Sequence, residues 1–144
     1  MEVDRNGLEV LGRDECLRLL RSATIGRVGT TIGALPTVLP VNFRVVDDRI
    51  VFRTTAGTKL DAATTNSVVA FEVDAIDPVS HAGWSVVVTG IAREVTEPHE
   101  LAELLAANIP FWAPNSDGHV VSIRTEIISG RRLSPRFHPR EEES

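Results

Sequence analysis

Cysteine is almost absent from this sequence, and its scarcity limits the chemistry that the chain can perform alone. Cys16 is the single cysteine among 144 residues, so no disulfide can form within the chain. Leucines at positions 17, 19 and 20 surround it, which favours a buried helix position for the thiol over a nucleophilic role. We therefore expect any redox chemistry to need a cofactor.

Long apolar runs and an excess of basic residues are missing as well. No stretch approaches the ~18 apolar residues that cross a bilayer, and acidic residues at positions 2 and 4 do not fit the basic start of a signal peptide. We therefore expect a cytoplasmic protein without a membrane partner. The formal net charge of -5 argues against nonspecific binding to nucleic acid, whose phosphates attract basic side chains.

The length suits one domain with a single core, large enough to bury about 70% of the surface of the unfolded chain. We assign the folded domain to residues 1–133 and expect residues 134–144, rich in Arg, Pro and Glu, to form a disordered tail. Neither a linker nor an internal repeat is visible.

Alternating apolar positions separated by turn residues predict six strands, at 24–30, 37–46, 49–54, 67–74, 84–95 and 119–128. Helical spacing predicts short helices at 13–22, at 59–65 and from 97 to 109. Gly90 suggests a bulge or bend in the fifth strand, of the kind that curls a sheet. The pattern favours a mainly β (α+β) fold, in the form of a closed or partly closed antiparallel barrel. An OB-like barrel or a small sandwich would give a similar pattern of strands along the sequence.

The segment from Arg53 to Lys59 has the properties of a phosphate site. A strand ends in hydroxyl residues that include Thr54, Gly57 allows close backbone approach, and Thr58 precedes the one lysine of the chain, where a helix begins. Hydroxyls, amides and a cation can then converge on one anion. A plain Thr/Gly turn with a solvated lysine would explain the same residues, since this is neither a Walker loop nor a dinucleotide fingerprint.

Two further segments are candidates for contacts with a flat ring. Pro40 has no N–H for a sheet ladder, so main-chain groups along Leu39, Pro40, Val41 and Asn42 could face a ligand; an edge strand blunted against aggregation is the alternative. Ser85 could donate to a ring or phosphate oxygen, whereas the adjacent Trp84 fits a core position at a barrel mouth. The four histidines show no metal-ligand spacing, and no nucleophile motif is present.

Taken in order, these segments resemble the pyridoxamine 5'-phosphate oxidase-like family of flavin-binding split barrels. The resemblance spans about 14–95 and rests on three motifs, which are Gly26-Arg27-Val28 leading to Pro40-Val41-Asn42, Phe52-Arg53-Thr54 through Lys59, and Trp84-Ser85-Val86 through Gly90. It implies a six-stranded antiparallel split β-barrel with two or three short helices. It also implies a homodimer with the cofactor at the subunit interface.

By this resemblance the chain is an FMN-binding oxidoreductase that passes a hydride or electron pair between flavin and a small organic substrate. Leu39, Pro40, Val41 and Asn42 would offer main-chain groups to the flavin ring. Arg53, Thr54, Thr58 and Lys59 would hold its phosphate, and Ser85 would contact the flavin, although this position is often glutamine in the family. No acid or base is assigned as catalytic, because the cofactor carries the chemistry.

The C-terminal residues lack the Trp and Arg pattern of the true pyridoxamine phosphate oxidases, so oxidation of that vitamin is doubtful. The deazaflavin F420 is the rival cofactor. Its acidic tail would need basic residues beyond the phosphate site, which Arg27, Arg44 and Arg53 could supply if they face one groove. A noncatalytic flavin carrier or a haem-binding module would also be compatible with this fold.

Overall fold

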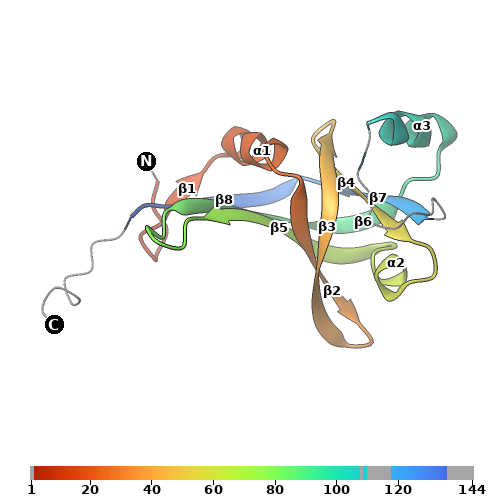
Figure 1. Cartoon of the computed structure of the whole chain (residues 1–144), viewed down its shortest axis with the longest axis horizontal. Coiled ribbons are helices and arrows are strands. Elements are labelled where there is room, and N and C mark those ends of the chain that lie inside the picture. Colours follow the sequence, from red (N-terminus) through yellow and green to blue (C-terminus); the bar gives the residue numbers. More distant parts are fainter. Residues whose placement is uncertain (1, 108, 110–117, 136–144) are drawn as a thin grey trace, which may run out of the picture.

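Six strands close into an antiparallel barrel, and two further strands extend one side of it (Figure 1). The computed structural model describes residues 2–107, 109 and 118–135. Around the barrel the order is β6-β5-β2-β3-β4-β7, and β7 pairs again with β6. These six strands are β2 (Ile25–Ile32), β3 (Leu35–Val46), β4 (Arg49–Thr55), β5 (Ser67–Ile76), β6 (Gly83–Glu94) and β7 (Gly118–Arg124). The predicted six-stranded antiparallel barrel is thereby confirmed.

Three short helices accompany the strands, as the sequence predicts. They are α1 (Arg13–Arg21), α2 (Lys59–Ala63) and α3 (Pro98–Ala106). In Figure 1, α1 lies above β8 (Ile127–Leu133) and α3 lies above β7, whereas α2 lies below β4 and β7. Among the described residues no helix is both long enough and apolar enough to cross a membrane.

The sixth predicted strand is too long, and two strands were not predicted. The segment 119–128 is broken after Arg124, and β8 (Ile127–Leu133) runs back along β6. No Gly, Pro, Asn or Asp marks this break, so the sequence carries no turn signal there. The extra β1 (Glu9–Leu11) pairs with β8 and is too short to show an alternating pattern.

Gly90 lies where one edge of β6 changes its partner strand. Residues Gly83 to Thr89 of β6 pair with β8, and from Ala92 onward the same edge pairs with β7. On the other edge the register with β5 runs unbroken from Ser67 to Ile76, so no bulge occurs on that side. At the position where the sequence suggests a bend, β6 therefore changes its partner from β8, in the extension, to β7, in the barrel.

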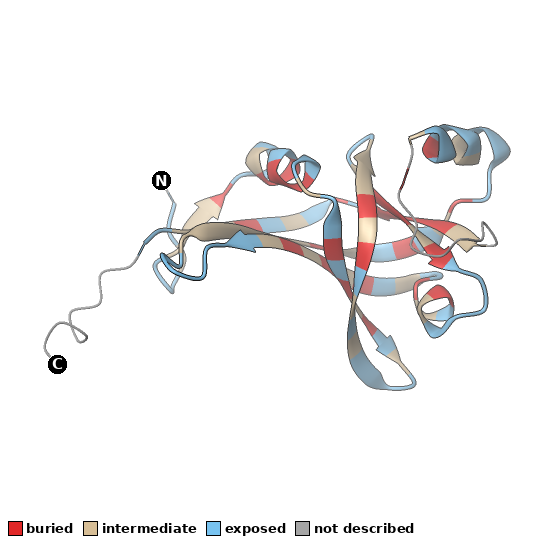
Figure 2. Cartoon of the chain, viewed as in Figure 1, coloured by how far each residue is buried: buried red, intermediate tan, exposed pale blue. Residues whose placement is uncertain are grey.

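Alternation along the strands puts the apolar residues inside the barrel (Figure 2). The rings of Phe43, Phe52 and Phe71 are fully buried there, and Phe43 meets Phe71 edge to face at 4.8 Å between centroids. Helix α1 covers one end of this core with Cys16, Leu17, Leu19 and Leu20. A second, smaller cluster lies between α3 and the outer side of β4 and β7, and contains Val51, Val95, Leu104, Ile109 and Val120.

Parts of two sequence predictions fall outside the described residues. They are position 108 within the helix predicted from 97 to 109, and the segment 136–144, which makes up most of the expected tail. The assignment of residues 1–133 to one domain stays a prediction.

Candidate functional site

The ladder between β3 and β4 ends at the pair Phe43 and Phe52, and beyond this pair the two strands no longer bond to each other. On β3 the next residue is Asn42, and on β4 it is Arg53. The segment predicted to hold a flavin ring and the segment predicted to hold a phosphate therefore begin on either side of this break in pairing, which we call the opening. Because they lie on strands joined by a short turn, the two candidate segments start next to each other.

One edge of β3 is unpaired along the predicted ring segment. The N–H of Phe43 donates to the carbonyl of Thr24 at 3.0 Å, so in an antiparallel ladder the main-chain groups of Val41 also point toward β2. Those of Asn42 and Pro40 then point to the opposite edge. Within residues 2–107, 109 and 118–135, no strand pairs with that edge before Phe43. Pro40 thus lies on an edge, as its missing N–H requires.

The turn after β4 is fixed by its own hydroxyl groups. Thr58 is the N-cap of α2: its side chain accepts from the N–H of Asp61 at 3.1 Å and donates to the carbonyl of Thr55 at 2.7 Å. Gly57 has a φ of 81°, which favours glycine. Lys59 is the first residue of α2 and is exposed to solvent.

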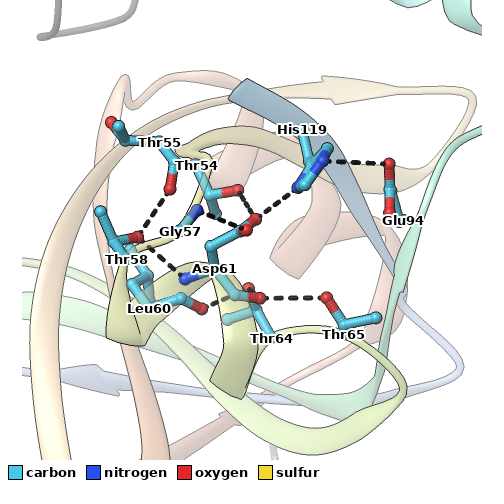
Figure 3. Close-up of polar contacts among 10 residues, drawn as sticks. All are labelled: Thr54, Thr55, Gly57, Thr58, Leu60, Asp61, Thr64, Thr65, Glu94 and His119. Carbon is cyan, nitrogen blue, oxygen red and sulfur yellow. Dashed lines mark hydrogen bonds and ion pairs between the residues drawn. The ribbon is translucent and has the colours of Figure 1, made fainter. Parts of the chain in front are cut away.

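A buried carboxylate lies beneath this turn (Figure 3). Asp61 is 8% exposed and accepts three hydrogen bonds, from Thr54 Oγ1 at 2.6 Å, from His119 Nδ1 at 2.6 Å and from the N–H of Gly57 at 3.2 Å. These donors come from β4, β7 and the turn itself. One side chain of α2 therefore ties the candidate phosphate segment to two strands of the barrel.

His119 extends this cluster toward β6. Its other ring nitrogen, Nε2, is 3.7 Å from a carboxylate oxygen of Glu94. Sequence patterns alone did not identify His119, Asp61 or Glu94 as site residues, because these residues are far apart in the chain. A capped helix with a carboxylate at its third position, such as Asp61 in α2, is a common local pattern. Only the register of β4 with β7, which puts Thr54 opposite His119, brings this carboxylate and the histidine together.

The cluster changes the ionisation of both partners. Burial opposes ionisation of Asp61, but hydrogen bonds from Thr54, His119 and Gly57 outweigh it, and the pKa of this carboxyl lies below its ordinary value. The hydrogen bond to Asp61 raises the pKa of His119 against the opposing effect of burial, and the charges of Asp61 and Glu94 add to the increase. The pair therefore favours an imidazolium beside a carboxylate.

The hydroxyls of two predicted phosphate ligands already have acceptors within the protein. Thr54 donates to Asp61 and Thr58 donates to Thr55, so a direct contact of either hydroxyl with a phosphate would require an exchange of partners. Lys59 needs no such exchange, because its ammonium is exposed at the same turn. The residues present thus fit a phosphate through Lys59 and main-chain groups, while contacts from Thr54 and Thr58 stay predictions.

Ser85 does not join the Asp61–His119 cluster within one chain. It lies on β6 nine residues before Glu94, a separation of roughly 30 Å along an extended strand. Its side chain is on the outer face of the sheet, as is Arg27, which is paired there with Glu72 at 3.2 Å and Asp74 at 3.4 Å. Arg27 is thereby engaged by two carboxylates of β5, while the register of β2 with β3 puts it opposite Pro40. A common groove for Arg27, Arg44 and Arg53 stays a prediction.

The sequence matches the family described as pyridoxamine 5'-phosphate oxidase over residues 12–132. Because this match covers most of the chain, the protein belongs to that family. The resemblance inferred from three short motifs is confirmed.

Individual relatives agree with this assignment. The chain is 44% identical to the uncharacterized protein Rv0080 of Mycobacterium tuberculosis, over 85% of this chain and 84% of that protein. Its fold is similar to that of an FAD binding protein from Mycobacterium smegmatis, with a TM-score of 0.77 and 38% identity, covering 87% of this chain and 99% of the other. A putative pyridoxamine 5'-phosphate oxidase from Corynebacterium glutamicum is 31% identical with the same TM-score, over 88% and 98% of the two chains.

Proposed function

We propose that this protein is a flavin-dependent oxidoreductase that binds FMN at the opening between β3 and β4. The observation that carries the proposal is the end of their ladder at Phe43 and Phe52. It leaves an unpaired main-chain edge on one side and the only lysine of the chain close to the other. A flat ring with main-chain hydrogen-bonding groups and a phosphate tail suits such a pair of surfaces.

Each segment has a distinct role in this proposal. The free edge of β3 orients the ring through main-chain groups of Pro40 and Asn42, and Lys59 neutralises the phosphate with support from Arg53. The bound flavin would supply transfer of a hydride or electron pair to or from a small organic substrate. The protein holds the ring in place and keeps one side open for that substrate.

The similarity to an FAD binding protein supports a flavin and widens the choice to FAD. FMN and FAD share the riboflavin phosphate portion, so the same Lys59 contact serves both. We keep FMN as the proposed cofactor and F420 as the alternative. The cofactor can be released from purified protein and identified by chromatography and mass spectrometry, which distinguish FMN, FAD and F420. Reduction of the bound flavin by a nicotinamide donor then separates an enzyme from a carrier.

The Lys59 contact is tested by comparing flavins with and without a phosphate. In a Lys59→Ala variant the affinity for FMN should fall about 10- to 150-fold, since a charge-assisted contact contributes ~1.5–3 kcal/mol. The affinity for riboflavin should change little, and Lys59→Arg should retain much of the FMN affinity. Full FMN affinity in Lys59→Ala would contradict the proposed phosphate site.

We also propose that two copies of the chain associate and that the second copy brings its Ser85 to the flavin. Large apolar side chains on the outer face of the sheet support this, because they are unusually exposed: Val38 at 66%, Val68 at 68% and Ile127 at 67%. The strand register puts Val38 and Ile127 in one row across that face, with Gly29, Ala70 and Thr89 between them.

A single charge on this face should separate the two copies. Val68→Asp is expected to convert a dimer to a monomer in light scattering coupled to gel filtration. Val79→Asp is the matched control, because Val79 is 89% exposed and lies in the loop between β5 and β6, off the sheet face. A wild-type protein that is monomeric at all concentrations would contradict the association.

A further inference from the structure

The contact between Asp61 and His119 lies directly under the turn where the phosphate is proposed to bind. The carboxylate of Asp61 receives the N–H of Gly57 and therefore touches the turn itself. The imidazole of His119 reaches the same carboxylate from β7 at 2.6 Å, and its side chain is 38% exposed. The histidine is thus both bonded to the buried acid and open to solvent protons.

A buried carboxylate at this position disfavours a bound anion. Asp61 and Glu94 contribute two negative charges beside this turn when ionised, and Lys59, the first residue of α2, contributes one positive charge. With a neutral histidine these three groups leave one negative charge in excess. One proton on His119 cancels this excess, and the low dielectric constant near buried groups increases the effect of that charge.

We propose that His119, held in place by Asp61, provides the charge that lets this turn accept a phosphate, so that protonation of His119 controls the affinity. This inference rests on the proposed function. His119 and Asp61 are positioning residues here, since neither needs to touch the flavin. The hydrogen bond can survive deprotonation, because a neutral imidazole can still carry a proton on Nδ1. Loss of the proton therefore changes the charge of the site more than its shape.

Among the described residues, the charged groups that face His119 favour its protonated form. Asp61 approaches from α2 and Glu94 from β6, and the residue opposite on β4 is the uncharged Thr54. The protonated state therefore persists above the ordinary pKa of histidine, about 6.5. Phosphate affinity should be highest below the pKa of His119 and fall as the pH rises through it.

The experiment measures FMN and riboflavin binding to the full chain by calorimetry from about pH 6.5 to about pH 9, above the pKa of a phosphate monoester near 6. The ratio of the two affinities isolates the contribution of the phosphate. In the wild type this ratio should fall about fivefold or more across the range, a common size for coupling between two sites. In His119→Gln it should be low throughout and independent of pH. The matched control His99→Gln, altered on the exposed surface of α3, should behave as the wild type.

A second measurement checks the pair without any flavin. The pKa of His119, followed by NMR, should drop toward the ordinary value in Asp61→Asn.

The possible outcomes separate this inference from the proposed function. A wild type that binds FMN and riboflavin equally, or neither, overturns the phosphate site and this inference with it. Two other results would overturn only the role of His119. In the first, the wild type prefers FMN but its preference does not depend on pH. In the second, the pH dependence of this preference persists in His119→Gln. An unchanged pKa in Asp61→Asn overturns the role of Asp61.

Discussion

The ring of Phe71 occupies the space in which any side chain at Gly26 would lie. A Cβ built at Gly26 would be 2.3 Å from Cζ of Phe71, and that ring is fully buried against Phe43. Gly26→Ala should therefore destabilise the barrel by about 1–3 kcal/mol, the usual cost of overpacking a core. Urea unfolding followed by tryptophan fluorescence measures the change.

A neighbouring glycine provides the control. At Gly29, on the same strand, a Cβ would have only an ordinary contact of 3.7 Å with Ala70. Gly29→Ala should leave the free energy of unfolding nearly unchanged. Similar unfolding midpoints for the two variants would show that Phe71 can move away from Gly26 at little cost.

Glu72 should make the stability of the protein depend on pH. Burial and the neighbouring Asp74 raise the pKa of Glu72 to about 7, although Arg27 acts in the opposite direction. The folded chain therefore keeps a proton that the unfolded chain releases near pH ~4.3. Stability should fall as the pH rises from about 4.5 to about 7, because the folded state binds more protons than the unfolded state in that range.

Glu72→Gln should remove this dependence. Its melting temperature should exceed that of the wild type more at pH 8 than at pH 5, as measured by calorimetry. Asp74→Asn should give a smaller effect in the same direction, because it removes the like charge but leaves Glu72 buried. An identical slope of stability with pH in Glu72→Gln and the wild type would rule this explanation out.

Thr125 links three segments at one end of the barrel. Its hydroxyl donates to the carbonyl of Asp48 at 2.6 Å and accepts from Arg13 at 3.0 Å, and the residue is 2% exposed. Thr125→Val keeps the shape and the bond from Arg13 to the main-chain carbonyl of residue 125, but removes the hydroxyl from Arg13 and from the carbonyl of Asp48, so it should reduce the free energy of unfolding by about 1–3 kcal/mol. Thr125→Ser should retain most of the stability. A valine variant as stable as the serine variant would mean that these hydrogen bonds contribute little.

Cys16 should be inert in the folded protein. It is 0% exposed, and burial raises the pKa of its thiol, so the reactive thiolate is scarce. A thiol reagent such as DTNB should label it only as the chain unfolds in urea. A cysteine introduced by Ser80→Cys, in an exposed loop, should react at once under native conditions. Rapid labelling of wild-type Cys16 without denaturant would contradict its burial.

Local patterns were sufficient to predict most of the barrel strands. Alternating apolar positions and turn residues predicted the strands from β2 to β6, and Thr58 before Lys59 predicted the start of α2. The missing N–H of Pro40 predicted an edge. Each of these depends on residues close together in the chain, where the period of a strand or the chemistry of a cap decides the outcome.

The acidic centre of the site could not be predicted in this way. Asp61 and His119 are 58 positions apart, and neither has a local pattern that points to the other. The break between β7 and β8 was missed for a related reason, since both strands are paired to β6 by tertiary contacts and no turn residue lies between them.

The sequence by itself determined a mainly β chain of this family, with one lysine at the start of a short helix and one proline on a strand edge. Only the tertiary structure decided that the β3–β4 ladder ends between the two candidate segments, that Asp61 lies buried beneath the turn, and that Ser85 faces another part of the sheet. The physical reason is that strand pairing joins residues distant in the chain. The burial and the hydrogen bonding of the site residues, and through them their charges, depend on which strands pair.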